Sequence, residues 1–300
     1  MKSNEYLAKV LASQTLGDDS VEMKALQEHR ADVEALLRHH FDDCSPSIRY
    51  GGSKIKGTMI RESFDLDIIC YFLQDDTGAG ETLEDIYNNT RAALQEKYLA
   101  EAKTSALRLK DADPKQLGVD FHIDVVPGRF TDDTKSDAFL YQSDSDKQRL
   151  KTNLDIHIDY VRDSGVTDAI RLIKLWKVRN GIILKHFVLD LAVIKLLTAK
   201  KKLDITAQLE HVLLEFRDNI AELTVEDPAN PEGNDLSGAL DGAKESLKAV
   251  ARRTLALIES SGWEAVFGPV DEKKAPEKTE ALRRAAAAVV TPTRPWLREA

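Results

Sequence analysis

Two aspartates at the start of a short apolar segment have the spacing of a cation site. Asp65 and Asp67 flank Leu66, and the segment 66–73 (LDIICYFL) predicts a buried strand. Alternation along a strand places residues i and i+2 on one face, so the two carboxylates project together if the strand begins at Asp65. Carboxylates this close repel each other unless a cation lies between them, and hard oxygen ligands suit Mg²⁺ or Mn²⁺.

A third carboxylate is expected from a second strand. The segment 117–126 alternates apolar and polar residues, with Asp120, His122 and Asp124 on one face. We interpret Asp124 as the ligand and His122 as a hydrogen-bonded neighbour. A third carboxylate from a neighbouring strand completes the ligands of a two-metal site that activates an attacking hydroxyl.

The turn Gly51-Gly52-Ser53 precedes the aspartate pair. Glycines let a backbone approach a ligand closely, and their N–H groups, together with the Ser53 hydroxyl, suit a triphosphate. A Gly-Gly-Ser turn and an Asp-x-Asp pair are each common. Their conjunction with a third aspartate on a later strand predicts metal-dependent chemistry on a nucleotide.

The elements that must position these residues change in character along the chain. In the first half the pattern predicts helices over 3–14, 20–40 and 81–101, and strands over 47–50, 66–73, 104–109 and 117–126, the last ended by Pro127-Gly128. Beyond residue 150 it predicts helices over 153–163, 167–180, 187–199, 204–219, 236–260 and 276–290. We therefore expect an α+β protein, with a catalytic lobe over 1–150 and an all-α lobe over 151–300. The site is expected in the cleft between them.

Composition narrows the class of protein. The 300 residues include 42 Lys+Arg against 51 Asp+Glu, and the net charge of −9 argues against a protein that coats long nucleic acid. The N-terminus lacks the apolar core of a signal peptide, and no apolar segment is long enough for a bilayer. Cys44 and Cys70 form no disulfide framework and are expected as reduced core residues. A cytoplasmic protein without membrane contacts is expected.

The motifs together resemble the nucleotidyltransferase superfamily of the DNA polymerase β type. The pattern is GGS(x)11DLD followed by a hydrophobic-Asp-hydrophobic-Val-Pro segment at 123–127. The segment 171–177 (RLIKLWK) is similar to the basic helix of 2′-5′-oligoadenylate synthetases, and 225–234 (VEDPANPEGN) resembles their DPxxPxxN segment. By this resemblance the chain is identified as a bacterial cGAS/DncV-like nucleotidyltransferase, or CD-NTase. That group makes cyclic di- or trinucleotide second messengers in anti-phage signalling (CBASS).

The resemblance implies a role for each matching residue. Two Mg²⁺ ions, with Mn²⁺ as a substitute, would be held by Asp65, Asp67 and Asp124. Asp124 would also help to activate the acceptor hydroxyl. Nucleotide phosphates would be bound by Gly52, Ser53, Lys174 and Lys177. For the two lysines a solvated helix face is the competing interpretation. Trp176 is interpreted as core between the lobes.

The implied partners are small molecules and proteins. NTPs, ATP among them, would be the substrates, with pyrophosphate released, and no long nucleic acid is expected. A regulatory protein and a separately encoded effector that binds the product are further implied partners. The base would be read near Tyr141, Gln142, Thr152 and Asn153, and its identity stays open. The DPxxPxxN segment is expected to cap the following helix.

Two other functions stay open. A template-independent enzyme could extend RNA or make linear oligonucleotides, but it needs a basic acceptor track, and the sequence has no long Lys/Arg-rich stripe. A catalytically silent nucleotide-binding module would keep the fold without the chemistry, and the intact aspartates argue against it.

Overall fold

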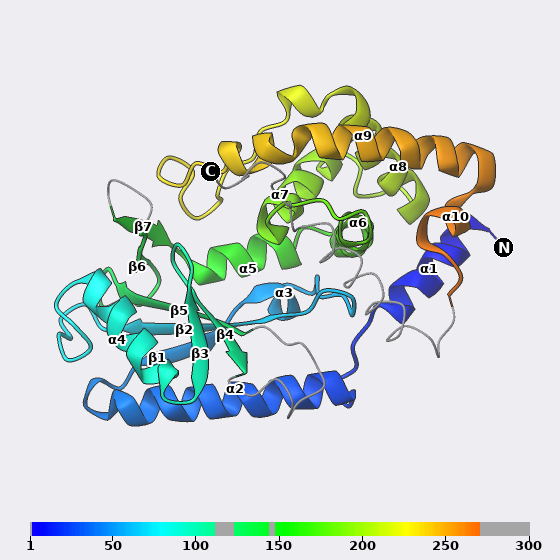
Figure 1. The fold of residues 1–300 in the computed structure, drawn as a ribbon. Coiled ribbons are helices and arrows are strands. Elements are labelled where there is room, and N and C mark those ends of the chain that lie inside the picture. Colours follow the sequence, from blue (N-terminus) through cyan, green and yellow to red (C-terminus); the bar gives the residue numbers. More distant parts are fainter. Residues whose placement is uncertain (1, 112–122, 144–147, 271–300) are drawn as a thin grey trace, which may run out of the picture.

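The computed structural model describes residues 2–111, 123–143 and 148–270 (Figure 1). Asp120, His122 and the helix predicted over 276–290 lie outside these residues. None of the described helices is long and apolar enough to cross a membrane.

The strands form one mixed sheet. Its strands are β1 (Ser47–Tyr50), β2 (Leu66–Phe72), β3 (Tyr98–Ala102), β4 (Leu107–Asp111), β5 (Ile123–Phe130), β6 (Ala138–Tyr141) and β7 (Arg149–Thr152). Their order is β1-β2-β5-β4-β3, with β6 beside the second half of β5 and β7 beside β6. The central pair β2 and β5 is parallel, and the other described pairs are antiparallel.

The helices lie on both sides of this sheet and in a layer above it (Figure 1). Those of the first half are α1 (Ser3–Ser13), α2 (Val21–His40), α3 (Gly52–Ile55) and α4 (Leu83–Gln95). Those of the second half are α5 (Leu154–Arg162), α6 (Thr167–Arg179), α7 (His186–Leu197), α8 (Ile205–Asp218), α9 (Ser237–Ser261) and α10 (Trp263–Phe267).

The two faces of the sheet are buried by different helices. On one face, alternate residues such as Leu66, Ile68 and Val125 pack in a core with apolar side chains of α2 and α4. On the other face, Ile69 and Tyr71 pack with residues of α5. Because side chains alternate along a strand, the residues between these core positions turn toward α5 and the helical layer.

A separate core joins the helices of the second half. It includes buried residues of α6, α7, α8 and α9, and also Tyr6, Leu7 and Val10 of α1. The Tyr6 hydroxyl donates a hydrogen bond to the carbonyl of Gly268 at 2.6 Å. The first helix of the chain therefore packs into the helical layer, although it begins the α/β half of the sequence.

The helix predicted over 81–101 is wrong in its second part. Thr82 and Asp85 form a capping box that begins α4, but the helix ends at Gln95 and β3 follows. In β3, Tyr98 and Ala100 are buried whereas Leu99 is exposed, so a period of two prevails over helix propensity there. The predicted elements also lack β6 and β7, each of four residues.

Pro127-Gly128 does not end its strand, contrary to expectation, because β5 continues to Phe130. On one edge β5 pairs with β4 up to Val125, and with β6 only from Gly128 onward. Pro127 lies where the neighbour changes, so its missing N–H interrupts neither ladder. A Cβ on Gly128 would lie 2.8 Å from the carbonyl oxygen of Phe139, which explains the glycine.

Candidate active site

Asp67 and Asp124 are direct neighbours on the two central strands. Their Cα atoms are register partners in the parallel pair β2–β5. Leu66, Ile68 and Val125 face the core under α2 and α4, so both aspartates project from the opposite face. Asp65 immediately precedes β2. The structure therefore brings Asp67 and Asp124 together, with Asp65 beside them.

Asp67 is the carboxylate of this group whose ionisation is disfavoured. Lost hydration, and then the charges of Asp65 and Asp124, raise the pKa of Asp67 to about 7. Lys56 and Arg108 act in the opposite direction. Carboxylates that disfavour one another's ionisation are stabilised by a bound cation.

The glycine turn packs directly against the Asp67 carboxylate. The backbone N–H of Gly51 donates to the Asp67 carbonyl at 2.9 Å. Gly52 has φ +77°, and a Cβ at this position would lie 2.0 Å from Asp67 Oδ2. The Ser53 hydroxyl oxygen is buried and makes no hydrogen bond. An unsatisfied buried hydroxyl beside carboxylates is available to a ligand.

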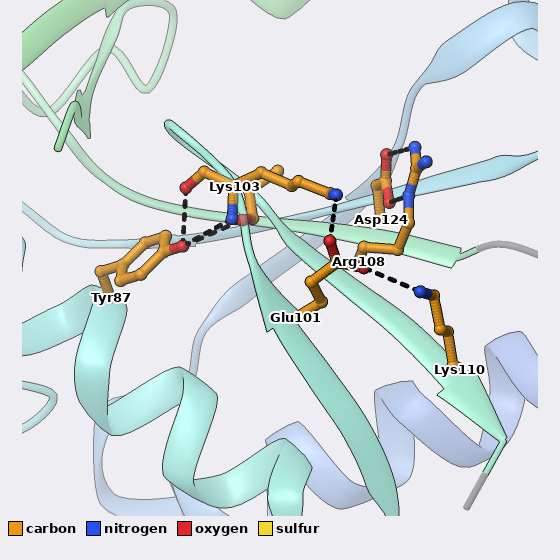
Figure 2. A network of polar contacts seen from close by, with 7 residues as sticks. Tyr87, Glu101, Lys103, Arg108, Lys110 and Asp124 are labelled. Atoms are coloured by element: carbon orange, nitrogen blue, oxygen red, sulfur yellow. Dashed lines mark hydrogen bonds and ion pairs between the residues drawn. The ribbon is translucent and has the colours of Figure 1, made fainter. Parts of the chain in front are cut away.

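Arg108 of β4 pairs with Asp124 (Figure 2). Its Nε donates to Oδ1 at 2.8 Å and its Nη2 to Oδ2 at 2.7 Å. Within the described ranges, no three His, Cys, Asp or Glu side chains are grouped so that they could hold a metal ion. The Arg108 guanidinium places a positive charge directly against the Asp124 carboxylate.

The donor set nevertheless fits Mg²⁺ in its chemistry. Asp67 and Asp124 supply carboxylate oxygens from adjacent strands, and Asp65 directly precedes β2. The Ser53 hydroxyl has no hydrogen-bond partner in the protein. Hard oxygen donors of this kind are the ligands that Mg²⁺ prefers. The residues predicted to hold the metal ions therefore have the right donor atoms, and their role as ligands stays a prediction.

The predicted basic helix α6 turns its lysines inward. Lys174 and Lys177 are 1% and 7% exposed, so the interpretation as a solvated face is wrong. Lys174 Nζ lies 3.0 Å from Asp190 Oδ1 and donates to Thr58 Oγ1 at 2.8 Å. Its ammonium group is therefore held inside the protein, between α7 and the loop after α3.

Further cations lie near the carboxylates. Burial, and then the neighbouring Lys174, lower the pKa of Lys177 to about 8, whereas Asp190 and Asp65 act to raise it. Burial also lowers the pKa of Lys56, against the opposing charges of Asp190 and Asp67. Positive side chains thus converge beside the aspartates, an arrangement suited to a polyanion.

Sequence reasoning missed three members of this site: Lys56, Arg108 and Asp190. Asp190 carried a usable signal, since a lone acid in the apolar helix 186–197 (HFVLDLAVIKLL) requires a buried partner. Lys56 follows the glycine turn closely enough to share its site. Arg108 could be found only once the register of β4 and β5 was known.

Neither a protein-family model nor a curated protein sequence matches the chain. Solved structures do. It resembles CdnC of E. coli MS115-1, solved with HORMA-deltaN, at TM-score 0.65 and 17% identity over 89% of this chain and 98% of that one. It resembles the CD-NTase CdnG of Bradyrhizobium diazoefficiens, solved with GTP, at TM-score 0.65 and 13% identity over 96% and 99% of the two chains. The chain has the CD-NTase fold.

A third similar structure is that of a synthase. It is the cyclic AMP-GMP synthase DncV of Vibrio cholerae with the linear intermediate pppA(3′,5′)pG, at TM-score 0.60 and 17% identity over 89% and 84% of the two chains. These likenesses confirm the predicted α+β nucleotidyltransferase fold.

In this CD-NTase fold, α6 anchors the loop that leads from the glycine turn to Asp65. Lys174 binds Thr58, and Arg171 Nε donates to the Met59 carbonyl at 3.3 Å. Arg179 Nε donates to Glu62 Oε2 at 2.9 Å. Three contacts from one helix therefore hold the loop between the glycine turn and Asp65 in place.

Two of the residues predicted to read the base, Tyr141 and Asn153, make contacts within the protein. The Tyr141 ring lies 5.3 Å from that of Tyr87, and its hydroxyl donates to Glu84 at 3.1 Å. Asn153 Oδ1 accepts the Ile156 N–H at 3.1 Å and caps α5. These contacts are structural, and a role in base selection stays a prediction.

Trp176 is buried, as expected, within the helical core. Its Nε1 donates to Thr254 Oγ1 at 2.9 Å, and its ring stacks on Phe216.

The DPxxPxxN segment does not cap α9, contrary to expectation. Asp227 is 1% exposed and accepts hydrogen bonds from Ala229, Asn234 and His157 instead. A buried carboxylate with three partners organises its own loop and ties it to α5.

Proposed function

We propose that the protein is a metal-dependent nucleotidyltransferase that condenses NTPs into a cyclic di- or trinucleotide with release of pyrophosphate. The observation that carries this proposal is the pairing of Asp67 with Asp124 beside Asp65, against the turn at Gly52. The likeness to DncV, a cyclic AMP-GMP synthase, supports the choice of product class. A role in anti-phage signalling belongs to the same proposal.

Two metal ions would be held by Asp65, Asp67 and Asp124. Bound there, they would acidify the attacking hydroxyl and neutralise the charge that develops on the pyrophosphate. The sheet would keep the three carboxylates on one face, with Asp124 on β5, where the acceptor hydroxyl would approach.

The triphosphate would lie between the glycine turn and the three lysines Lys56, Lys174 and Lys177. The Gly52 N–H and the unpaired Ser53 hydroxyl would orient its phosphates. Lys177 and Lys56 would neutralise their charge, and Lys174 would add its charge from the position fixed by Asp190. Fixed charges in a water-poor site stabilise phosphoryl transfer more than mobile ones.

The division into lobes 1–150 and 151–300 and the implied partners are also proposals. NTPs, ATP among them, would enter between the two lobes. The solved complex of CdnC with HORMA-deltaN supports a regulatory protein as one partner. A separately encoded effector would bind the product.

The test is pyrophosphate release from all four NTPs with Mg²⁺, compared for the full chain and for Asp65→Asn and Asp67→Asn. Each substitution should lower the rate by about 10³-fold or more, because the loss of a metal ligand removes charge stabilisation of several kcal/mol. Asp163→Asn, at an exposed aspartate after α5, is the matched control and should retain full activity. Unchanged activity of both site variants would refute the proposal.

Product analysis separates the competing functions. A cyclic product resists phosphatase and gives a single mass without terminal phosphate. A product degraded by phosphatase would instead identify an enzyme that makes linear oligonucleotides. Stabilisation by NTP and Mg²⁺ without any turnover would identify a silent binding module.

A further inference from the structure

Four charged side chains form a row across the sheet. Asp67 is the register partner of Asp124, Asp124 is that of Arg108, and Arg108 is that of Glu101. Directly paired residues on neighbouring strands project from the same face of a sheet. The row therefore places one guanidinium between two carboxylates, with the proposed metal site beyond Asp124.

Arg108 engages both oxygens of Asp124 in this row (Figure 2). A fork-to-fork pair of this kind uses the carboxylate lone pairs that face the partner, and it places a full positive charge there. A divalent cation approaching Asp124 would need the same oxygens and would be repelled by the guanidinium. Asp124 thus has two competing partners.

Glu101 offers Arg108 a second position. It lies opposite Arg108 on β3, and its carboxylate is bound by Lys103 and Lys110, the latter at 2.9 Å (Figure 2). Both lysines are well exposed, with 39% and 52% of their side-chain surface open to water, so they can exchange this carboxylate for solvent at little cost.

We propose that Arg108 is a positioning residue that occupies Asp124 in the metal-free protein and transfers to Glu101 when a divalent cation binds. Arg108 keeps Asp124 aligned and balances its negative charge until the cation arrives. Because the cation must displace Arg108, Asp124 contributes less to the affinity for the cation than a free carboxylate would. This inference rests on the proposed function, because it takes Asp124 as a metal ligand.

The experiment measures Mn²⁺ affinity of the full chain by electron paramagnetic resonance, in the presence of a nonhydrolysable ATP analogue. Arg108→Gln should tighten Mn²⁺ binding about tenfold, because one charge-assisted hydrogen-bonded pair no longer competes. Arg108→Lys keeps the positive charge but cannot bind both carboxylate oxygens, so its Mn²⁺ affinity should lie between those of wild type and Arg108→Gln. Lys110→Gln removes a positive charge from the same face of β4 without touching Asp124, and it should change the affinity less than Arg108→Gln.

Glu101 supplies the decisive contrast. Glu101→Gln should weaken Mn²⁺ binding, because Arg108 loses its second position. In the Arg108→Gln background the same substitution should have no further effect. A merely structural arginine would not produce this dependence. Thermal unfolding adds a second measurement, since Arg108→Gln should be less stable than wild type without metal and should gain more stability on adding Mn²⁺.

Two results separate failure of the inference from failure of the proposed function. If Arg108→Gln weakens Mn²⁺ binding or leaves it unchanged, while Asp67→Asn abolishes it, Arg108 supports the metal site and does not compete for it. If wild type and Asp67→Asn bind Mn²⁺ equally, the aspartates are not metal ligands, and the proposed function itself fails.

Discussion

Lys174 and Asp190 form an ion pair at 3.0 Å in which the two side chains are only 1% and 3% exposed. They join α6 to α7, and Thr58 adds a hydrogen bond from the loop after α3. The pair thus lies where the helical layer meets the segment that carries the glycine turn. Its geometry fixes the position of a positive charge beside the candidate active site.

Asp190→Ala should destabilise the protein by about 3–5 kcal/mol, because it leaves the Lys174 ammonium buried without a counter-charge. Urea unfolding measures this loss. The double variant Lys174→Met with Asp190→Leu should recover most of the stability, since apolar side chains of similar size replace a buried pair well. Pyrophosphate release should stay impaired in that double variant. A loss below about 1 kcal/mol for Asp190→Ala would show that the pair is hydrated.

The two glycines of the turn should differ in their tolerance of a methyl group. Gly52 has φ +77°, and a Cβ there would lie 2.0 Å from Asp67 Oδ2, whereas a Cβ on Gly51 would meet Leu154 Cδ1 at 3.3 Å. Gly52→Ala should therefore displace the Asp67 carboxylate and lower activity about 100-fold, as expected for a displacement of about 1 Å.

Gly51→Ala is the matched control for that substitution. The flexible Leu154 side chain can yield by a few tenths of an ångström, so most activity should remain. Steady-state kinetics of the two variants under identical conditions provides the comparison. Equal losses in both would mean that the turn tolerates no side chain at all, and that contact with Asp67 is not the cause.

The orientation of the aspartates could be predicted from the sequence. Alternation along 66–73 correctly placed Leu66 and Ile68 in the core and Asp67 on the opposite face. The buried free cysteines Cys44 and Cys70 are likewise confirmed. These features depend on local periodicity, which a single segment carries in full.

Features that depend on register or on distant partners were out of reach. The sequence places Arg108 near the end of a predicted strand, but nothing local tells that it faces Asp124 and not the core. A solvated face was the competing interpretation of the two lysines because Lys is seldom buried, and the contact that overrides it comes from Asp190 on another helix. Similarly, β3 follows α4 without a Gly or Pro to mark the boundary.

Lys177 should give the protein a stability that rises with pH in the alkaline range. Burial and the neighbouring Lys174 lower its pKa from the ordinary 10.5 to about 8 in the folded state. Between these two values the unfolded chain holds the proton more tightly than the native protein, so the free energy of unfolding increases as pH rises. Below pH 8 both states are protonated, and the burial of the charge is a constant cost.

Lys177→Met should remove this dependence and be more stable than wild type near pH 7, with the difference shrinking toward pH 10. Urea unfolding at several pH values measures it. Lys202→Met, at an exposed lysine, is the control and should follow the wild-type curve. A difference between wild type and Lys177→Met that stays constant with pH would contradict the prediction.

Asp227 should contribute stability that is lost in acid. Burial acts to raise its pKa, but hydrogen bonds from His157 and Asn234 outweigh burial, so the pKa of Asp227 is lowered. The ionised carboxylate is thus favoured in the native state, and its stabilisation is present above the ordinary Asp value and disappears as pH falls through the lowered one. Asp227→Asn should cost about 1.5–3 kcal/mol at pH 7, the range for hydrogen bonds to a charged group.

The difference between wild type and Asp227→Asn should narrow below about pH 4, where the wild-type carboxyl is protonated in the unfolded chain. Glu232→Gln changes an exposed carboxylate of the same loop and should leave the unfolding free energy within about 0.5 kcal/mol of wild type. Because Asp227 joins its loop to α5, and α5 covers the active-site face of the sheet, Asp227→Asn should also lower the rate of pyrophosphate release. Unaltered stability and activity at pH 7 would mean that the segment 225–234 does not depend on its buried aspartate.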